Sequence, residues 1–250
     1  MPPSAPMTRQ TVVEPPTQDR LIADALIADI VEWRIAPGAW LREREVAQRF
    51  GVSHAPVREA FRHVARVGFI QIVPWRGAHV IDLDAHAAIE VFELWKALFG
   101  VICRMAAQTF NPADGQELLK RIEAFKTIVR ETPDTLAHLA VSNSIGSFIA
   151  HRSGAPMASE LLDRVALFAR WQHHVLRVDY LESIKPRPGI RSAELYEAVC
   201  HHIVRGEADA ADRAARELLA FLQKHFEPAL DQFLAERKAE PAKRRRPPRA

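Results

Sequence analysis

The spacing of apolar residues predicts three helices in the first third of the chain. A stripe at every third or fourth position indicates the first helix, and its members are Ile22, Leu26, Ile30 and Trp33. The run "APG" at 36–38 ends this helix. A short helix is expected at about 43–50, ended by Gly51, and a longer helix follows it. Ser53 stands at the N-cap position of the longer helix, and Pro56 lies in its first turn, where a missing N–H costs little.

After the third helix the pattern changes to that of strands. Val57, Phe61 and Val64 give the helix a face to bury, and Gly68 follows it. The run "FIQIV" predicts a strand, "PWRG" a tight turn and "AHVI" a returning strand. Helix, short helix, turn, helix and hairpin, in this order, predict a winged helix-turn-helix domain over residues 18–82.

From about residue 84 the strand pattern disappears and only helical periodicity remains. Six helices are expected, over 85–109, 112–131, 135–152, 156–182, 190–206 and 210–236. The fold class is therefore mainly α: an N-terminal winged helix-turn-helix followed by an all-α bundle of about six helices over 84–237. The ends of the chain, 1–17 and 238–250, are rich in proline, small polar or basic residues, and we expect them to be disordered.

Composition and charge limit the classes of function. The 250 residues are 48% hydrophobic and 26% charged, which is typical of a globular protein. The sequence has no run of about 18 apolar residues and no secretory leader. The net charge is +3, but the tail "KRRRPPR" alone contributes five positive charges. The positive charge that matters is local, because seven arginines between Arg42 and Arg76 stand against three glutamates.

The two cysteines, Cys103 and Cys200, lie inside apolar helical patterns and far apart in the sequence. We expect two reduced thiols in the core of a cytoplasmic protein. A disulfide or a redox pair is the alternative.

The polar residues of the third helix lie apart from its apolar face. His54, Arg58 and Arg62 recur at every fourth position, so the fold directs them outward when the apolar face packs inward. A basic stripe of this kind is either a solvated helix face or a surface for the major groove. Spacing alone leaves both possibilities open.

The tip of the hairpin favours the DNA-binding interpretation. Trp75, Arg76 and Gly77 stand where a wing would approach the minor groove or its phosphates. Gly77 has no Cβ, which would allow the backbone a close approach.

The stretch "IAPGAWLREREVAQRFGVSHAPVREAFRHVARVGFIQIVPWRGAHV" resembles the DNA-binding domain of GntR-type bacterial transcription regulators. It carries PG-x-x-L-x-E-x-x-[VL]-A, then GVS-x-x-PVREA, a glycine before the hairpin, and RG at its tip. The resemblance covers residues 21 to about 81. It implies that the DNA contacts are made by Arg44, Ser53, His54, Ala55, Arg58, Arg76 and Gly77.

The resemblance also implies roles for these residues. Arg44 and Arg58 are expected to contact bases, because a guanidinium bridges guanine O6 and N7 and discriminates by about 1–3 kcal/mol. Ser53 is expected to bind phosphate. His54 departs from the family, in which most members carry arginine there. Histidine is shorter and a weaker cation at neutral pH, so we expect a different operator preference at this position.

The helical half resembles the FCD effector-binding domain of the FadR-like branch, through its helix layout, an "SGAP" break and an "RGEADAAD" turn. In many such domains an acidic residue and three histidines hold a divalent metal that binds a carboxylate effector. Here the corresponding positions carry Ser142, Gly146, Tyr196 and Leu218. Other histidines are offset along their helices, namely His151, His201 and His225. We therefore expect no metal or other cofactor, with a rearranged metal site as the alternative.

The first helix of this half also departs from the family, with Trp95 and Phe99 where arginine and glutamate are common. These changes predict an apolar, aromatic effector pocket lined by Trp95, Phe99, Gly146, Tyr196 and Leu218. The effector would be larger and less charged than a dicarboxylate. Alternatively, core packing fills the cavity and no effector binds.

Taken together, the sequence predicts a cytoplasmic transcription regulator, a repressor by family habit, that is gated by a small-molecule effector. We expect a homodimer on an inverted-repeat operator in double-stranded DNA. The alternative is a constitutive DNA-binding dimer whose helical domain binds no ligand. An enzyme is not expected, because the sequence has no G-x-G-x-x-G, P-loop, G-x-S-x-G or H-E-x-x-H motif.

Overall fold

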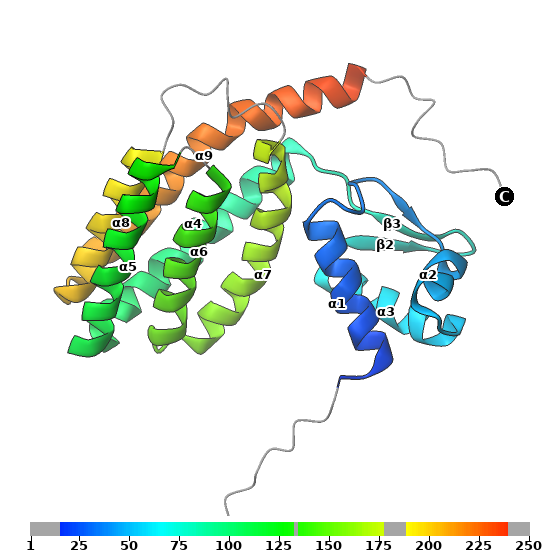
Figure 1. Cartoon of the computed structure of the whole chain (residues 1–250), viewed down its shortest axis with the longest axis horizontal. Coiled ribbons are helices and arrows are strands. Elements are labelled where there is room, and N and C mark those ends of the chain that lie inside the picture. Colours follow the sequence, from blue (N-terminus) through cyan, green and yellow to red (C-terminus); the bar gives the residue numbers. More distant parts are fainter. Residues whose placement is uncertain (1–15, 133–134, 178–188, 240–250) are drawn as a thin grey trace, which may run out of the picture. The chain divides into compact units, whose positions relative to one another are not determined.

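The structure, a computed structural model, describes residues 16–132, 135–177 and 189–239 (Figure 1). These residues form two compact units. The first contains the described residues up to Asp29 together with Ala39–Ile81, and the second contains Ile30–Gly38 together with the described residues from Asp82 onward. The segment Ile30–Gly38 thus belongs to the helical unit, although it falls within the span predicted for the winged domain.

The first unit has three helices and a three-stranded antiparallel sheet. Its elements are α1 (Gln18–Val31), β1 (Trp40–Leu41), α2 (Glu43–Phe50), α3 (His54–Val67), β2 (Ile70–Val73) and β3 (Gly77–Val80). The strand order is β1-β3-β2, and the β2–β3 register runs from Ile70 opposite Val80 to Val73 opposite Gly77. This arrangement confirms the predicted winged helix-turn-helix fold.

Strand β1 was not predicted. It is only two residues long, with Trp40 opposite His79 and Leu41 opposite Ala78 on β3. Two residues are too few to produce an alternating pattern, so only the pairing with β3 makes this segment a strand.

The core of the first unit forms as the apolar spacing predicts. The buried face of α3, Val57, Phe61 and Val64, packs with apolar residues of α1 and the hairpin, namely Ile22, Leu26, Phe69, Ala78 and Val80. Helix α2 ends at Gly51, which adopts the left-handed conformation (φ 65°) that favours glycine at a helix C-terminus. The short, capped α2 and the buried face of α3 together fix which side of α3 faces outward.

The second unit is helical throughout its described residues. Its elements are α4 (Ala85–Thr109), α5 (Pro112–Glu131), α6 (Thr135–Arg152), α7 (Pro156–Gln172), the 3-10 helix η1 (His173–Arg177), α8 (Gly189–Val204) and α9 (Ala208–Ala239). Polar caps set two of the starts, since Asp84 accepts hydrogen bonds from the backbone N–H groups of His86 and Ala87, and Asn111 accepts one from Asp114. These starts agree with those expected from the sequence.

Three helix ends differ from the expectation; that of α8, at Val204, differs by only two residues. The helix predicted over 156–182 ends as an α-helix at Gln172 and continues as η1; residues 178–182 lie outside the described residues. Apolar spacing does not separate a 3-10 turn from an α-helix, which explains the error. Helix α9 continues through Pro228 to Ala239, because Phe226, Ala229 and Leu230 around the proline are buried and hold the helix in place.

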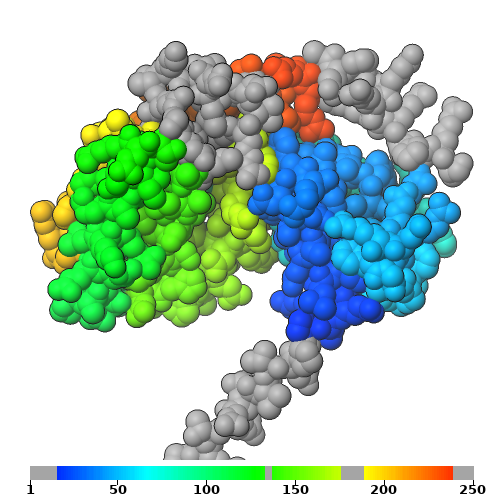
Figure 2. Space-filling view, viewed as in Figure 1, coloured from blue at the N-terminus to red at the C-terminus, as the bar shows by residue number. Residues whose placement is uncertain are grey.

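Helix α4 forms the centre of the helical unit, packing on α9, α7, α6 and α8. Its buried residues include Phe99, Ile102, Cys103 and Ala106. Figure 2 shows the closely packed side chains of α5, α6 and α7 on one face of this unit. Within the described residues, no helix is long and apolar enough to cross a membrane.

Both cysteines are buried in this core and are not joined in a disulfide. Burial raises the pKa of the Cys103 thiol well above its ordinary value, and the nearby Cys200 and Asp212 raise it further. Burial likewise raises the pKa of Cys200. Two protonated thiols in the core match the reduced pair expected from the sequence rather than a redox pair.

Candidate functional site

The first candidate site is the outer face of α3. Val57 and Val64 have no accessible surface and Phe61 only 2%, so the helix cannot turn without exposing its core face. His54 and Arg58 are consequently exposed on the opposite side, close to the N-terminal end of the helix. This is the end that a recognition helix directs at base edges in the major groove.

Glu43, at the start of α2, lies between the two exposed residues of α3. Its Oε2 atom is 3.8 Å from Nδ1 of His54 and 3.6 Å from Nη1 of Arg58. The side chains of His54 and Arg58 are more than half exposed, so these ion pairs add little to stability. Their effect is positional, because the carboxylate places both side chains near the tip of α3.

The other residues predicted to contact DNA lie around this tip. Arg44 is exposed on α2, one residue after Glu43, and Ala55 is exposed in the first turn of α3. Ser53 is the N-cap residue by its backbone conformation (φ −75°, ψ 170°), but its hydroxyl makes no capping hydrogen bond. The first N–H groups of α3 therefore lack a side-chain cap from Ser53 and point toward the side where a phosphate would bind.

Three aromatic side chains, those of Trp40, Trp75 and His79, lie on or beside the wing. The guanidinium of Arg76 lies 4.8 Å from the centre of the Trp40 ring, and the Trp40 ring lies 5.1 Å from that of His79. Trp75, at the tip, is fully exposed and has a positive φ of 64°. Arg76 is thus held against the sheet by a cation–π contact, whereas Trp75 projects away from the sheet.

Gly77 is required by the sheet itself. It has φ 103°, and a Cβ placed on it would lie 2.2 Å from the backbone oxygen of Leu41 in β1. The sequence suggested that the missing Cβ serves an approach to DNA. The structure gives a different reason, because the space that a Cβ would occupy is taken by the neighbouring strand.

The second candidate site is a cavity of about 290 Å³ inside the helical unit. All five residues predicted to form an effector pocket, Trp95, Phe99, Gly146, Tyr196 and Leu218, line it. The wall is completed mainly by apolar side chains such as Phe125, Leu162, Leu222 and Phe226. Residues from α4, α6, α8 and α9 that are far apart in the sequence are therefore brought together around one space.

Gly146 and Tyr196 are sterically coupled. The Tyr196 hydroxyl donates a hydrogen bond to the backbone oxygen of Ser142 at 3.2 Å, and a Cβ on Gly146 would lie 3.0 Å from that hydroxyl. The Tyr196 ring also makes an edge contact with Phe99, with ring centres 6.2 Å apart. Burial raises the pKa of Tyr196 well above its ordinary value, so the phenol stays neutral. Tyrosine at 196 therefore needs the small residue at 146.

Three histidines line the cavity. His138 Nε2 lies 2.9 Å from the backbone oxygen of Thr132, and His225 Nδ1 lies 2.8 Å from that of Phe221, so each donates through one nitrogen and leaves the other as an acceptor when neutral. His173 is enclosed by the rings of Phe92, Trp95 and Phe226. Burial, and then the neighbouring His174, lower the pKa of His173 to about 4, so it is uncharged at neutral pH.

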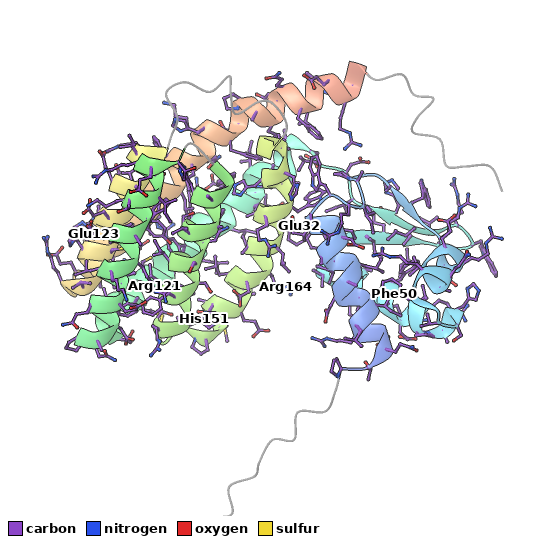
Figure 3. All side chains as sticks on the ribbon, viewed as in Figure 1. Glu32, Phe50, Arg121, Glu123, His151 and Arg164 are labelled. Atoms are coloured by element: carbon purple, nitrogen blue, oxygen red, sulfur yellow. The ribbon has the colours of Figure 1, made fainter. Side chains whose placement is uncertain are left out.

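These cavity histidines were not predicted as site residues, although the sequence left His173 and His225 open as ligands of a rearranged metal site. His151, near the end of α6, is exposed and its Nδ1 lies 2.7 Å from the backbone oxygen of Ser147 (Figure 3). His201 lies beside Glu197 on α8, with Nε2 3.8 Å from Oε1. Within the described part of the chain, no three His, Cys, Asp or Glu side chains gather as a metal site would require.

Arg170 was also missed. It lines the cavity from α7, and its Nη2 lies 3.1 Å from Oε1 of Glu32. The sequence gave no reason to single out this arginine, because the partner Glu32 is 138 residues away.

Comparison with known proteins identifies the first unit. Residues 18–80 match the model of the gntR family of bacterial regulatory proteins. Residues 18–80 form a GntR-type winged helix-turn-helix domain. The chain spans about half the length of the curated relatives that it matches first.

Two curated relatives show the range of similarity. The HTH-type transcriptional repressor RspR of Escherichia coli is 48% identical over 114 residues, which is 45% of this chain and 50% of that protein. A probable D-xylose utilization operon transcriptional repressor of Paenarthrobacter nicotinovorans is 31% identical over 122 residues, 49% of this chain and 51% of that protein.

A solved structure extends the likeness in fold to both units. E. coli McbR/YncC has a TM-score of 0.67 with this chain at 19% sequence identity, covering 88% of this chain and all of the other. At this identity the likeness concerns fold alone. It agrees with the observed order of a winged helix-turn-helix domain followed by a helical domain.

Proposed function

We propose that the protein is a sequence-specific transcription regulator that binds operator DNA through its GntR-type domain. The proposal rests chiefly on the exposed surface formed by Arg44, the start of α3 and the wing, in a domain where the apolar face of α3 is buried. Two similar curated proteins are named as repressors, which favours repression over activation. A regulator of this kind needs no catalytic group, in keeping with the absence of enzyme motifs in the sequence.

In the proposed complex, Arg58 leaves Glu43 and bridges O6 and N7 of a guanine in the major groove. Arg44 makes a second base contact from α2, and each contact is expected to discriminate by about 1–3 kcal/mol. Ser53 and the N-terminal N–H groups of α3 bind a phosphate and fix the register. His54, beside Glu43, replaces the arginine common in the family and changes the base preference at its position.

We propose that the regulator is a homodimer that contacts the two halves of an inverted repeat. An exposed apolar stripe along α4 supports this. Leu94 is 47% exposed and Val101 40%, and they lie seven residues apart, with the half-buried Leu98 between them and Met105 following. This heptad spacing suits the pairing of α4 with its copy in a second chain.

The helical unit is proposed to be an FCD-type effector-binding domain of the FadR-like branch. Its cavity is lined largely by aromatic and aliphatic side chains, and the histidine enclosed by aromatic rings, His173, is uncharged at neutral pH. The other polar residues of the wall include Ser142, Asn143, Ser147, Asp163 and Ser192. Arg170, a positively charged residue of the cavity wall, forms an ion pair with Glu32. These features favour an uncharged effector, apolar or aromatic, over a dicarboxylate, and no resident metal is needed to hold it.

Contacts within the helical unit suggest how an effector would act. Glu32, at the segment that follows α1, accepts from Arg170 and lies 3.5 Å from Nε2 of His174 (Figure 3). The ring of Trp33 stacks on His174 with centres 5.6 Å apart. Arg170, which contacts Glu32, and His173, which precedes His174, both line the cavity. A ligand that displaces them would therefore alter the contacts that hold the segment Ile30–Gly38.

The rival proposal is a constitutive DNA-binding dimer. It is favoured if the cavity is a packing defect that no ligand fills. The two proposals are distinguished by measuring the thermal unfolding midpoint of the full chain in the presence of each compound of a library of uncharged aromatic and aliphatic molecules. A compound that raises the midpoint in the wild type but not in an Ala166→Leu variant, in which a side chain that lines the cavity is enlarged, supports an effector; the absence of any such compound supports the rival.

DNA binding is tested by selection of bound duplexes from a random library with the full-length protein. We expect enrichment of one inverted repeat, and an Arg58→Ala variant that loses the preference for it. A matched Arg20→Ala variant, which removes an exposed arginine of α1, should select the same repeat. Selection of no common sequence by the wild type would contradict the proposal.

A further inference from the structure

The tip of the wing presents an aromatic side chain to solvent in a conformation that aromatic residues rarely adopt. Trp75 is fully exposed, and its φ of 64° lies in the left-handed region. The backbone N–H of Arg76 bonds to the oxygen of Val73 at 3.1 Å and closes the turn around it. A tryptophan is a poor residue for such a turn, where asparagine or glycine fit better, so stability of the turn does not explain its presence.

The neighbouring arginine does not share the position at the tip. Arg76 is held over the Trp40 ring at 4.8 Å, and Trp40 is itself packed near His79 on β3. Arg76 is therefore directed along the sheet, while the indole of Trp75 is the outermost group of the hairpin. The wing offers DNA one positioned cation and, beside it, one large apolar ring.

We propose that Trp75 is a DNA contact that inserts its indole into the minor groove next to the base pairs bound by α3. This inference rests on the proposed DNA-binding function. Apolar side chains that enter the minor groove pack against sugars or wedge between base steps, and they favour sequences that deform easily. The indole N–H adds a donor for the O2 and N3 acceptors of A·T pairs. Trp75 thus makes the wing sensitive to the composition of the minor groove, and Trp40 positions Arg76 on the adjacent phosphates.

A second exposed apolar residue on the same hairpin provides the comparison. Ile72, on β2, is 47% exposed and lies on the strand rather than at the tip. If exposed apolar surface on the wing were incidental, the two residues would be equally dispensable for DNA. The proposal assigns the DNA contact to Trp75 alone.

The test measures the affinity of full-length variants for a duplex that the wild type has selected from a random library. Trp75→Asn removes the ring and keeps a residue that tolerates positive φ, so the turn is preserved. We expect this variant to bind about tenfold more weakly, with the preference for A·T pairs under the wing reduced and the dependence of log K on log salt unchanged, because no phosphate contact is lost. Ile72→Ala should bind within about twofold of the wild type, since its side chain is assigned no contact with DNA.

Arg76→Ala and Arg58→Ala complete the experiment. Arg76→Ala should lower the salt slope by about one, as expected for loss of a phosphate contact. Unchanged affinity and sequence preference in Trp75→Asn, with the preference for the selected duplex still reduced by Arg58→Ala, would overturn the inference and leave the proposed function intact. An Arg58→Ala variant that keeps the full preference of the wild type would contradict the proposed function itself. If Trp75→Asn and Ile72→Ala lose the same affinity for the duplex, the inference about Trp75 is also overturned, since the effect would then belong to the hairpin as a whole.

Discussion

At the residue scale, the candidate DNA surface is organised around Glu43. Its carboxylate lies within 4.0 Å of both His54 and Arg58, so one acidic residue lies between two residues that are proposed to contact bases. The motif alone suggested which residues are exposed, but not that one acidic residue joins them. The distances across the turn between α2 and α3 supply that connection.

Replacing His54 with arginine tests the departure from the family pattern. The longer, permanently charged side chain should reach a base or phosphate that histidine does not, so the preferred base should change at one position of each half-site. Selection from a random duplex library by the wild type and His54→Arg measures this. An unchanged preferred sequence would show that His54 does not contribute to operator choice.

Alanine substitutions at two glycines of the first unit distinguish the cost of backbone strain from the cost of steric crowding. Gly51 (φ 65°) has no atom within 4 Å of the position of a Cβ, whereas the Cβ of residue 77 would lie 2.2 Å from the Leu41 oxygen. Gly51→Ala should cost about 1–2 kcal/mol of unfolding free energy, the cost of a left-handed non-glycine residue. Gly77→Ala should cost more than about 2 kcal/mol, because β1 must also move.

Chemical denaturation of the two full-length variants measures this difference. Equal stabilities, with DNA binding reduced only in Gly77→Ala, would support the idea that the missing Cβ serves DNA and contradict the role assigned to the sheet.

At the element scale, the sequence determined most helices and the hairpin but not the short or irregular segments. The caps at Asp84 and Asn111 and the apolar stripe of α3 predicted their elements because the information is local. Strand β1 and the change from α7 to η1 depend on pairing and packing with distant segments, which periodicity cannot convey. For the same reason Arg170 and the cavity histidines were missed, whereas the five residues expected at an effector pocket, which were chosen from motif positions, line one cavity.

The η1 helix carries a titratable group that should make stability depend on pH. Burial lowers the pKa of His173 to about 4 from an ordinary value of 6.5. Between these values the unfolded chain binds a proton at His173 that the folded chain does not, so the free energy of unfolding falls as the pH falls from about 6.5 to 4. The loss due to His173 is at most about 1.4 kcal/mol per pH unit in this window.

A His173→Phe variant keeps a ring in the aromatic cluster and removes the titration. Urea denaturation between pH 7 and 4.5 should show a weaker loss of stability for the variant than for the wild type. Parallel curves for the two proteins would mean that His173 is protonated as easily when folded as when unfolded.

At the scale of the whole molecule, the proposed function depends on two chains that contact two half-sites. The α4 stripe with Leu94 and Val101 is the surface proposed for pairing. Glutamate at either position should place a charge in the interface and shift the protein to monomer, with operator affinity falling by more than tenfold, because the half-sites are then bound separately. Met157→Glu, which charges an exposed apolar site on α7 instead, should leave the dimer unchanged.

Sedimentation equilibrium measures the association state of these variants. Dimers of undiminished affinity in Leu94→Glu and Val101→Glu would exclude α4 as the dimer surface.

The central claim is that the α2–α3 tip of the GntR-type domain recognises a particular DNA sequence. It is tested most directly by titrating the selected duplex and a scrambled duplex with the wild type, Arg44→Ala, Arg58→Ala and the control Arg20→Ala. We expect the wild type and Arg20→Ala to prefer the selected duplex strongly, and each of the other two variants to lose roughly 5- to 150-fold of that preference, the equivalent of about 1–3 kcal/mol. Equal binding of both duplexes by the wild type, or undiminished preference in Arg44→Ala and Arg58→Ala, would contradict it.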